Sequence, residues 1–271
     1  MKNFSQCLLG ILMVLLAGCA TTPPAKEIKD GPLGYEVDVS NIPDACPKVE
    51  PRSRYGNPSS YQVNGRSYRT LQTSQNYRAR GIASWYGTKF NGQYTSSREP
   101  YNMLGMTAAH RTLPLPTYAK ITNLQNGHQV IVKINDRGPF DPNRLIDLSY
   151  AAAKKLGITQ KGTGLVEVTA IDPSRPEVAN QYATKQVSQA KPGQPILYMQ
   201  IGSFANQANA DKLANRVRQL TAKPVRVKLA DNVKNPVYRV QIGPLSDVAE
   251  SDILHRKLRS EKLGAPLTVI E

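Results

Sequence analysis

The C-terminal part of the chain repeats one order of structural signals twice. Residues 198–204 (YMQIGSF) and residues 238–244 (YRVQIGP) each contain a strand pattern and a glycine turn, and a polar capping residue and a helical pattern follow each of them. Two more strand patterns, at residues 224–230 and 266–270, complete the series. The order is therefore β-α-β-β-α-β, which predicts four antiparallel strands with both helices on one face of the sheet. This repeat restricts the fold more strongly than any other feature of the sequence.

The predicted sheet has a second face that neither helix covers. Because successive strand residues point to opposite sides, the apolar residues face the helices and the polar ones face outward. We predict that this open face binds a ligand, since glutamine recurs at the same place in both halves of the repeat. A merely solvated face would also be polar, so the pattern alone leaves that alternative open. The residues concerned are Tyr198, Gln200, Ser203, Phe204, Arg226, Lys228, Arg239 and Gln241.

The N-terminus has the pattern of a bacterial lipoprotein signal peptide. Lys2 gives a positive start, and the apolar run at residues 8–16 is too short to span a membrane as a mature helix. The run ends in Leu-Ala-Gly before Cys19, which predicts cleavage after residue 18 and lipidation of Cys19. An ordinary secretory signal with a chance cysteine is the alternative. Ala20 in the next position resembles lipoproteins sorted to the outer membrane, so we expect a lipid-anchored protein that faces the periplasm.

Cysteine content and charge limit the remaining classes. Once Cys7 leaves with the signal and Cys19 carries lipid, Cys46 is the one cysteine left, and it cannot form an intrachain disulfide. The net charge of +15 favours a polyanionic partner such as nucleic acid, an anionic membrane or an acidic cell-wall polymer. An exported protein is not expected to bind nucleic acid, so a sugar polymer is the better candidate. The sequence has no metal-ligand cluster or phosphate loop, and we expect no metal or cofactor.

Changes in composition divide the chain into five segments. A length of 271 residues leaves room for roughly two domains. The stretch before residue 79 and the one after residue 172 are polar and rich in proline, which indicates a tether and a linker. The predicted segments are a signal peptide at 1–18, a lipidated tether at 19–78 that is partly ordered near its end, a first domain at 79–172, a linker at 173–194 and a second domain at 195–271.

The first domain is predicted to consist mainly of short strands. Two alternating patterns flank Gln125-Asn126-Gly127, and Asn-Gly in such a position is a strong hairpin signal. The second of these strands ends at Asp136, on the inward side if the alternation continues that far. A short helix follows, with Asp147 or Ser149 as its N-cap and Gly157 as its C-cap. Many strands with one helix indicate a small barrel that binds its ligands at its open end.

Several motifs resemble known families. The C-terminal domain resembles a SPOR domain, a module that binds peptidoglycan strands lacking stem peptides. The first domain resembles the double-psi β-barrel of the rare lipoprotein A (RlpA) family, and the order of lipobox, barrel, linker and SPOR domain matches that family over nearly the whole mature chain. The motifs in the first domain are GIASWYG at 81–87, TAAHRTLPLPTYAKITNLQNG at 107–127, NDRGPF at 135–140 and DLSYAAAKKLG at 147–157.

The resemblance implies an endolytic lytic transglycosylase of cell-wall remodelling and daughter-cell separation. Such an enzyme cleaves the bond between N-acetylmuramic acid and N-acetylglucosamine and leaves 1,6-anhydro ends. One carboxyl group can protonate the glycosidic oxygen and then help the C6 hydroxyl group attack, so paired carboxylates are not obligatory. The resemblance also implies enrichment at the septum and partners among division-site proteins. The alternative is a peptidoglycan-binding scaffold lipoprotein whose barrel is inactive.

The family's functional residues map to Asp136, Glu99 and His110. We predict Asp136 as the acid/base and His110 as a residue that orients it or holds substrate. Glu99 either stabilises positive charge at the anomeric carbon or exchanges roles with Asp136. An acid needs surroundings that favour its protonated form, so we expect the next residue, Arg137, to point elsewhere. Substrate contacts in the barrel are predicted for Trp85, Tyr86 and Arg137.

The chain departs from the family pattern in two places: it has Asn91-Gly92 where family members commonly read HG, and TSSRE at 95–99 where they commonly read TANGE. Arg98 stands where family members commonly have glycine, immediately before Glu99. The change reduces backbone freedom there. It also adds a cation beside Glu99, which favours a charge-stabilising role for that carboxylate over acid catalysis.

Overall fold

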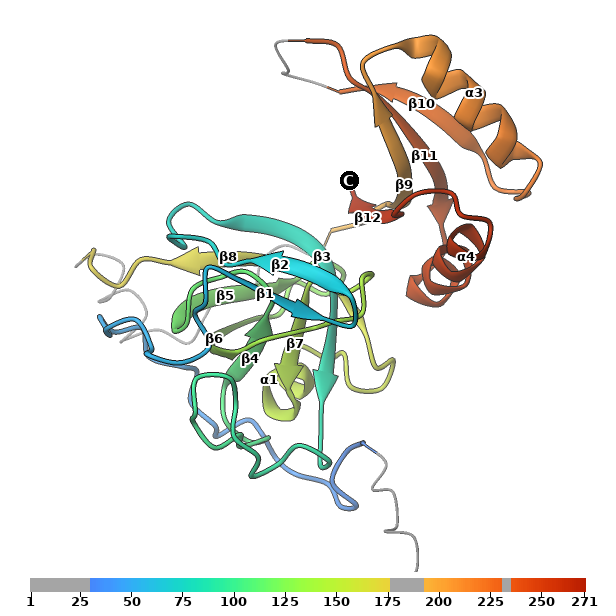
Figure 1. Ribbon diagram of the computed structural model, residues 1–271. Helices are drawn as coiled ribbons and strands as arrows, with labels where there is room; N and C mark the ends of the chain where they lie inside the picture. The colour runs from blue at the N-terminus through green and yellow to red at the C-terminus, as the bar shows by residue number, and fades with distance from the viewer. Residues whose placement is uncertain (1–29, 176–192, 231–234) are drawn as a thin grey trace, which may run out of the picture.

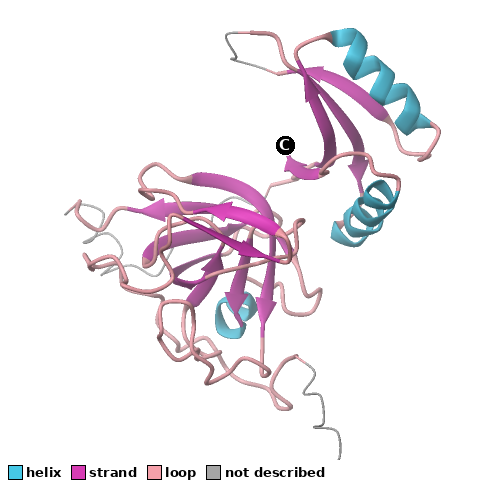
Figure 2. Cartoon of the chain, in the orientation of Figure 1, coloured by secondary structure: helices cyan, strands magenta, loops and turns pink. Residues whose placement is uncertain are grey.

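The computed structural model describes residues 30–175, 193–230 and 235–271, which form two units (Figure 1). The predicted signal peptide, Cys19 and most of the predicted linker lie outside these ranges. In the described ranges, no helix has both the length and the apolar character that a membrane span requires. The first unit is a β-barrel with one short helix, and the second is a sheet with two helices (Figure 2).

The first unit is a closed barrel with the strand order β3-β7-β4-β6-β5-β8, which confirms the predicted barrel. Strands β3–β7 and β4–β6 pair in parallel, whereas β4–β7, β5–β6, β5–β8 and β3–β8 pair antiparallel. The elements are β3 Arg78–Tyr86, β4 Thr107–His110, β5 Thr117–Asn123, β6 Gln129–Asp136, β7 Ile146–Ser149, α1 Tyr150–Lys155 and β8 Gly164–Ile171.

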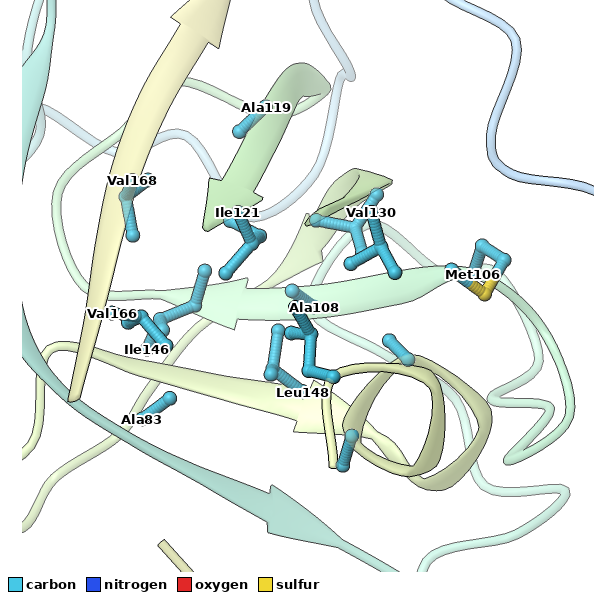
Figure 3. Packing of buried hydrophobic residues seen from close by; sticks show 14 of the residues in the cluster. Ala83, Met106, Ala108, Ala119, Ile121, Val130, Ile146, Leu148, Val166 and Val168 are labelled. Atoms are coloured by element: carbon cyan, nitrogen blue, oxygen red, sulfur yellow. The ribbon is translucent and has the colours of Figure 1, made fainter. Parts of the chain in front are cut away.

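Apolar side chains of medium and small size fill the barrel interior. Ile121 of β5, Val130 of β6, and Ile146 and Leu148 of β7 point inward and are at most 1% exposed (Figure 3). Alanine residues on β3, β4 and β5 leave room for them, as expected of a small barrel whose interior holds side chains only. Chemistry is therefore restricted to the strand ends and the loops around them.

Local signals in the sequence account for the connections near the site. Gly127 adopts a positive φ of 76° in the turn between β5 and β6, as the Asn-Gly pair predicts. Ser149 caps α1 by accepting a hydrogen bond from the Ala152 amide, so of the two predicted caps it is the one used. Asp147, the other candidate, lies within β7 instead.

The region before residue 78 is folded over more of its length than predicted for a tether that is ordered only near its end. From residue 30 onward it packs along the barrel, with Val39 in the barrel core and the Ala45 amide bonded to the Ile131 carbonyl oxygen at 3.1 Å. It also forms a hairpin of β1 (Ser60–Val63) and β2 (Arg66–Arg69). The folded unit therefore begins well before residue 79. Its few apolar residues are widely spaced, and the pattern they leave is too weak to reveal this packing.

The second unit confirms the β-α-β-β-α-β prediction. Its sheet has the antiparallel order β10-β11-β9-β12, and one apolar cluster joins the inner faces of β9 and β11 to both helices. The helices lie along the same side of the sheet in Figure 2. The elements are β9 Leu197–Phe204, α3 Gln207–Arg218, β10 Val225–Leu229, β11 Tyr238–Leu245, α4 Val248–Ser260 and β12 Leu267–Ile270.

The two units contact each other beside the segment that leads into β7. Arg144 donates hydrogen bonds to both carboxylate oxygens of Asp252 on α4, at 2.8 and 2.6 Å. The Asn143 side-chain amide donates to the same carboxylate at 2.7 Å. Ile82 and Leu165 of the barrel join the apolar cluster of the second unit. The Arg144 guanidinium group is thus paired across the contact, which matters for the carboxyl groups nearby.

Candidate functional site

Asp136 is the last residue of β6, as predicted, but a bulge sets its direction. Residues Ala108 and Ala109 of β4 pair with Ile134 and Asp136, so Asn135 is an extra residue between them. A bulge of this kind re-aims the side chains around it and is common beside active sites. Simple strand alternation therefore does not describe where the Asp136 carboxyl group points.

One oxygen of Asp136 is held by three hydrogen bonds. Oδ1 accepts from the Ser96 amide at 2.8 Å, the Ser96 hydroxyl group at 2.6 Å and the Arg137 amide at 2.7 Å. Among the described residues, no hydrogen bond reaches Oδ2. The carboxyl group is thus fixed through one oxygen while the other is free to meet a substrate.

Glu99 lies in the loop before β4 and is paired with a cation from β6. Lys133 Nζ lies 3.0 Å from Glu99 Oε1, and the Asn135 side-chain amide donates to Oε2 at 2.8 Å. Burial lowers the pKa of Lys133, but Glu99 and Glu50 raise it overall, so the lysine stays charged. Glu99 is therefore arranged as a carboxylate, which suits charge stabilisation.

Arg98 is not the cation that acts on Glu99. Its guanidinium carbon lies 5.4 Å from the centre of the Tyr55 ring, within cation–π range. Its backbone has a positive φ of 71°, a conformation that glycine adopts without strain. The backbone change predicted for residue 98 is therefore present, but the cation beside Glu99 is Lys133 and not Arg98.

His110 ends β4 with a side chain that is 2% exposed. Its Nδ1 accepts hydrogen bonds from the Thr112 and Leu113 amides, so Nε2 carries the proton and donates to the Tyr77 hydroxyl group at 3.0 Å. Burial and the charges of Arg111 and Arg137 lower the pKa of His110 to about 3. The imidazole neither bonds Asp136 nor faces solvent, so the predicted direct role does not fit its position. It instead fixes the loop after β4.

Arg137 points away from Asp136, as predicted, but it is not a free substrate ligand. Its guanidinium group donates to three main-chain carbonyl oxygens and one side-chain amide oxygen, all of which belong to the segments around it. The acceptors are Gly56 O at 2.7 Å, His110 O at 3.0 Å, Leu113 O at 2.5 Å and Asn57 Oδ1 at 3.0 Å. The predicted substrate contact therefore does not fit this geometry. Arg137 fastens the N-terminal segment to the end of the barrel.

Trp85 and Tyr86 belong to an aromatic cluster at the end of β3. Trp85 packs edge-on against Tyr150 with ring centres 5.5 Å apart, and Tyr86 stacks on Tyr101 at 4.1 Å. Both side chains are half-buried. The Tyr86 hydroxyl group is buried and has no hydrogen-bond partner within the described part of the chain.

Sequence reasoning missed three residues of this region. Ser96 holds Asp136, and Lys133 pairs with Glu99. Asp147 is a second aspartate in the same row of strands as Asp136. Burial raises the pKa of Asp147. The sequence carried no signal for Ser96 or Lys133, since their partners are distant along the chain. Asp147 was visible, but its position before a helix suggested a capping role.

The open face of the C-terminal sheet departs from its prediction at three residues, and Arg226 covers two of them. Tyr198 and Gln241 are 7% and 1% exposed, because Arg226 covers both. The Arg226 guanidinium carbon lies 3.7 Å above the Tyr198 ring centre, and Nε donates to Gln241 Oε1 at 2.9 Å. Strand alternation gives the correct face but does not reveal a side chain that folds over its neighbours.

The other candidate residues of this face form a more accessible row. Ser203 is exposed and accepts a hydrogen bond from the Gln200 side-chain amide at 3.1 Å. Arg239 on β11 lies opposite Ser203 on β9 in the strand register. Phe204 is half-buried and packs against the apolar core, so it is not part of the open surface. Glu271 lies at the edge and pairs with Arg226 at 2.8 Å and Lys228 at 3.0 Å.

Fold and site together define a class of protein. A barrel with carboxyl groups at its strand ends precedes a β-α-β-β-α-β unit with a basic face. The family model described as lytic transglycolase matches residues 78–168, and the SPOR domain model matches residues 194–267. The chain thus combines a barrel of the lytic transglycosylase type with a SPOR domain.

Relatives define the family more narrowly. The protein called endolytic peptidoglycan transglycosylase RlpA in Pseudomonas aeruginosa UCBPP-PA14 is 36% identical, over 97% of this chain and 95% of that protein. The protein of that name in Vibrio cholerae is also 36% identical, over 92% of this chain and 91% of its own length. A crystal structure of the RlpA SPOR domain from Pseudomonas aeruginosa is 32% identical over 27% of this chain and 96% of that one, with a TM-score of 0.26. This chain belongs to the RlpA family.

Proposed function

We propose that this chain is an endolytic lytic transglycosylase that cleaves peptidoglycan glycan strands lacking stem peptides. The observation that carries the proposal is the mounting of Asp136, which combines a fixed Oδ1 with an Oδ2 free for substrate. Near-complete alignment with proteins named for this activity supports it. The products expected are glycan fragments with 1,6-anhydro ends.

The different surroundings of Glu99 and Asp136 suit them to different catalytic roles. In the simplest assignment Asp136 performs both proton transfers, first to the glycosidic oxygen and then from the C6 hydroxyl group. Glu99, held as a carboxylate by Lys133 and Asn135, stabilises the positive charge that develops at the anomeric carbon. His110 and Arg137 act as positioning residues that hold the loops around Asp136.

The SPOR domain is proposed to recruit the barrel to its substrate. Removal of stem peptides frees the lactyl carboxylate of each N-acetylmuramic acid, so a denuded strand is a polyanion. Arg226, Lys228 and Arg239 on the open face match that charge, and Gln200 and Ser203 offer hydrogen bonds to sugar hydroxyl groups. Binding of this kind weakens as salt concentration rises.

A lipid anchor on Cys19 would hold the protein at the outer membrane, facing the periplasm. The motif around Cys19 supports this proposal, together with the small residues before it. Enrichment at the division septum follows if denuded glycan accumulates there, and division-site proteins are the partners expected.

The test is incubation of the detergent-purified full chain with amidase-stripped sacculi, followed by mass spectrometry of the released material. The parent is expected to release anhydro-ended fragments, and Asp136→Asn to release at least about 100-fold less. Asp211→Asn, which makes the same charge change on α3, serves as the matched control. Binding without release by the parent would mean a scaffold protein on an inactive barrel.

A further inference from the structure

A second carboxyl group lies in the same row of strands as Asp136. Ala109 of β4 pairs with Asp136 of β6 on one side and with Asp147 of β7 on the other. Ser84 of β3 extends the row beyond Asp147. Two strand spacings separate the two aspartates, or about 10 Å between their α-carbons. Carboxyl groups that flank a glycosidic bond in two-carboxylate enzymes lie roughly 5–9.5 Å apart, a separation that aspartate side chains on α-carbons at this spacing can reach.

Asp147 has no cation partner within the described part of the chain. Arg144 and Arg111 are the nearest cations, but Arg144 is paired with Asp252, and Arg111 donates to main-chain carbonyl oxygens. Asp141 adds a negative charge nearby. Ser84 donates the hydrogen bond that the carboxyl group receives at Oδ1. Burial is the largest influence and raises the pKa of Asp147, which favours its protonated form.

Two small residues, Ala109 and Gly138, lie beside Asp147. A β-carbon added to Gly138 would lie 3.9 Å from Asp147 Oδ2 and 3.8 Å from the β-carbon of Ala109. Gly138 also has a φ of 133°, which other residues rarely adopt. Burial, helped by the charges of Tyr101, Asp136 and Asp147, raises the pKa of Tyr86 well above its ordinary value, while the Thr107 hydroxyl group acts in the opposite direction. Both hydroxyl groups are buried and have no hydrogen-bond partner within the described residues. An unsatisfied hydroxyl group in this place suits a polar ligand.

We propose that Asp147 protonates the leaving oxygen while Asp136 accepts the proton of the attacking hydroxyl group. The C1–O4 bond breaks, and its electron pair remains on O4, which takes the Asp147 proton. The C6 oxygen attacks C1, and its proton moves to Asp136. Proton exchange with water then restores both residues. This inference rests on the proposed function and replaces the simpler assignment of both transfers to Asp136.

The surroundings of the two residues fit this division. Three donors on Oδ1 suit Asp136 as a carboxylate, which is the form a base requires. Asp147 receives one hydrogen bond and forms no salt bridge with the described residues. The charges of Arg144 and Arg111 lower its pKa, but burial has the larger effect and raises it, as an acid requires. Pairs of carboxyl groups whose environments differ in this way commonly supply the acid and the base of a reaction.

The test compares Asp147→Asn and Asp136→Asn in the full chain on two substrates. The first is denuded glycan, and the second is a GlcNAc-MurNAc disaccharide whose leaving group is 2,4-dinitrophenolate, which departs without protonation. Asp147→Asn is expected to lose about 100-fold or more on glycan, yet to stay within about tenfold of the parent on the dinitrophenyl glycoside. Asp136→Asn is expected to be impaired on both.

The Ser84→Ala variant tests the acid role of Asp147 through the pH dependence of kcat/KM, which a merely structural role of Asp147 would leave unchanged. Its hydrogen bond lowers the pKa of Asp147, so its removal is expected to shift the alkaline limb of the kcat/KM profile to higher pH. Sacculus binding and far-ultraviolet circular dichroism should match the parent in all three variants. Equal impairment of Asp147→Asn on both substrates, or an unmoved limb in Ser84→Ala, would overturn the acid assignment.

Different results contradict the proposed function and the role of Asp147. A parent that releases no anhydro ends contradicts the proposed function. A parent that is active alongside an Asp147→Asn variant within about threefold of it on glycan leaves that function intact and contradicts the role of Asp147.

Discussion

The end of the barrel and the open face of the SPOR sheet hold their polar groups in different ways. Asp136 is fixed by two main-chain amides and a serine, and Arg137 beside it donates mostly to main-chain oxygens. On the SPOR sheet the cations pair with the side chain of Glu271, at the edge of the sheet. The main-chain contacts in the barrel hold the Asp136 carboxyl group in one position for catalysis. The cations of the SPOR sheet can instead exchange the Glu271 carboxylate for an anionic ligand.

Loss of Arg137 is expected to have the largest effect on stability. Arg137→Ala removes four hydrogen bonds and leaves main-chain oxygens of Gly56, His110 and Leu113 without donors. We expect a loss of about 3–4 kcal/mol in the free energy of unfolding, measured by urea titration. Arg69→Ala on the exposed edge of β2 should cost less than about 0.5 kcal/mol. Equal effects of the two changes would contradict the structural role of Arg137.

His110 makes the barrel sensitive to acid. Its pKa is about 3 in the folded state, against about 6.5 in the unfolded chain, so between these values the unfolded chain binds a proton that the folded one does not. The parent should therefore lose about 1.4 kcal/mol per pH unit relative to His110→Asn as the pH falls from 6 to 4. Asparagine keeps an acceptor for the loop amides and does not titrate. Parallel stability curves for the two proteins would contradict this prediction.

Lys133 is expected to affect catalysis through Glu99. Lys133→Met leaves Glu99 without its cation, so among the described residues only the Asn135 amide still holds its carboxylate. We expect a roughly tenfold loss of activity on denuded glycan, about 1.4 kcal/mol, with sacculus binding unchanged. Lys120→Met, on the adjacent strand β5, is the matched control. A similar loss in the control would mean that charge alone is responsible.

Changes at the SPOR face should be the smallest. Glu271→Gln releases Arg226 and Lys228 for a ligand, and surface ion pairs of this kind contribute about 0–1 kcal/mol. We expect binding to denuded glycan to strengthen by about two- to threefold at low salt and to match the parent at high salt. Glu261→Gln at the end of α4 is the control. Weaker binding by Glu271→Gln would mean that the carboxylate positions the cations for the glycan instead of competing with it.

Features set by neighbouring residues were predictable from the sequence, and those set by distant contacts were not. The Asn-Gly turn at Gly127, the cap at Ser149 and the β-α-β-β-α-β order all follow from local patterns. The pairing of Lys133 with Glu99 and the covering of Tyr198 by Arg226 depend on residues that only the fold brings together. The packing of residues 30–59 was missed for the same reason, because the contacts of this stretch are made with the barrel.

The most direct test of the central claim is to run the reaction of the full chain on denuded glycan in water labelled with oxygen-18. Attack by the C6 hydroxyl group predicts released ends that carry no label and lack the mass of one water molecule, and that are absent with Asp136→Asn. Reducing ends carrying one labelled oxygen would show that water is the nucleophile, and would contradict the account of this barrel as a lytic transglycosylase.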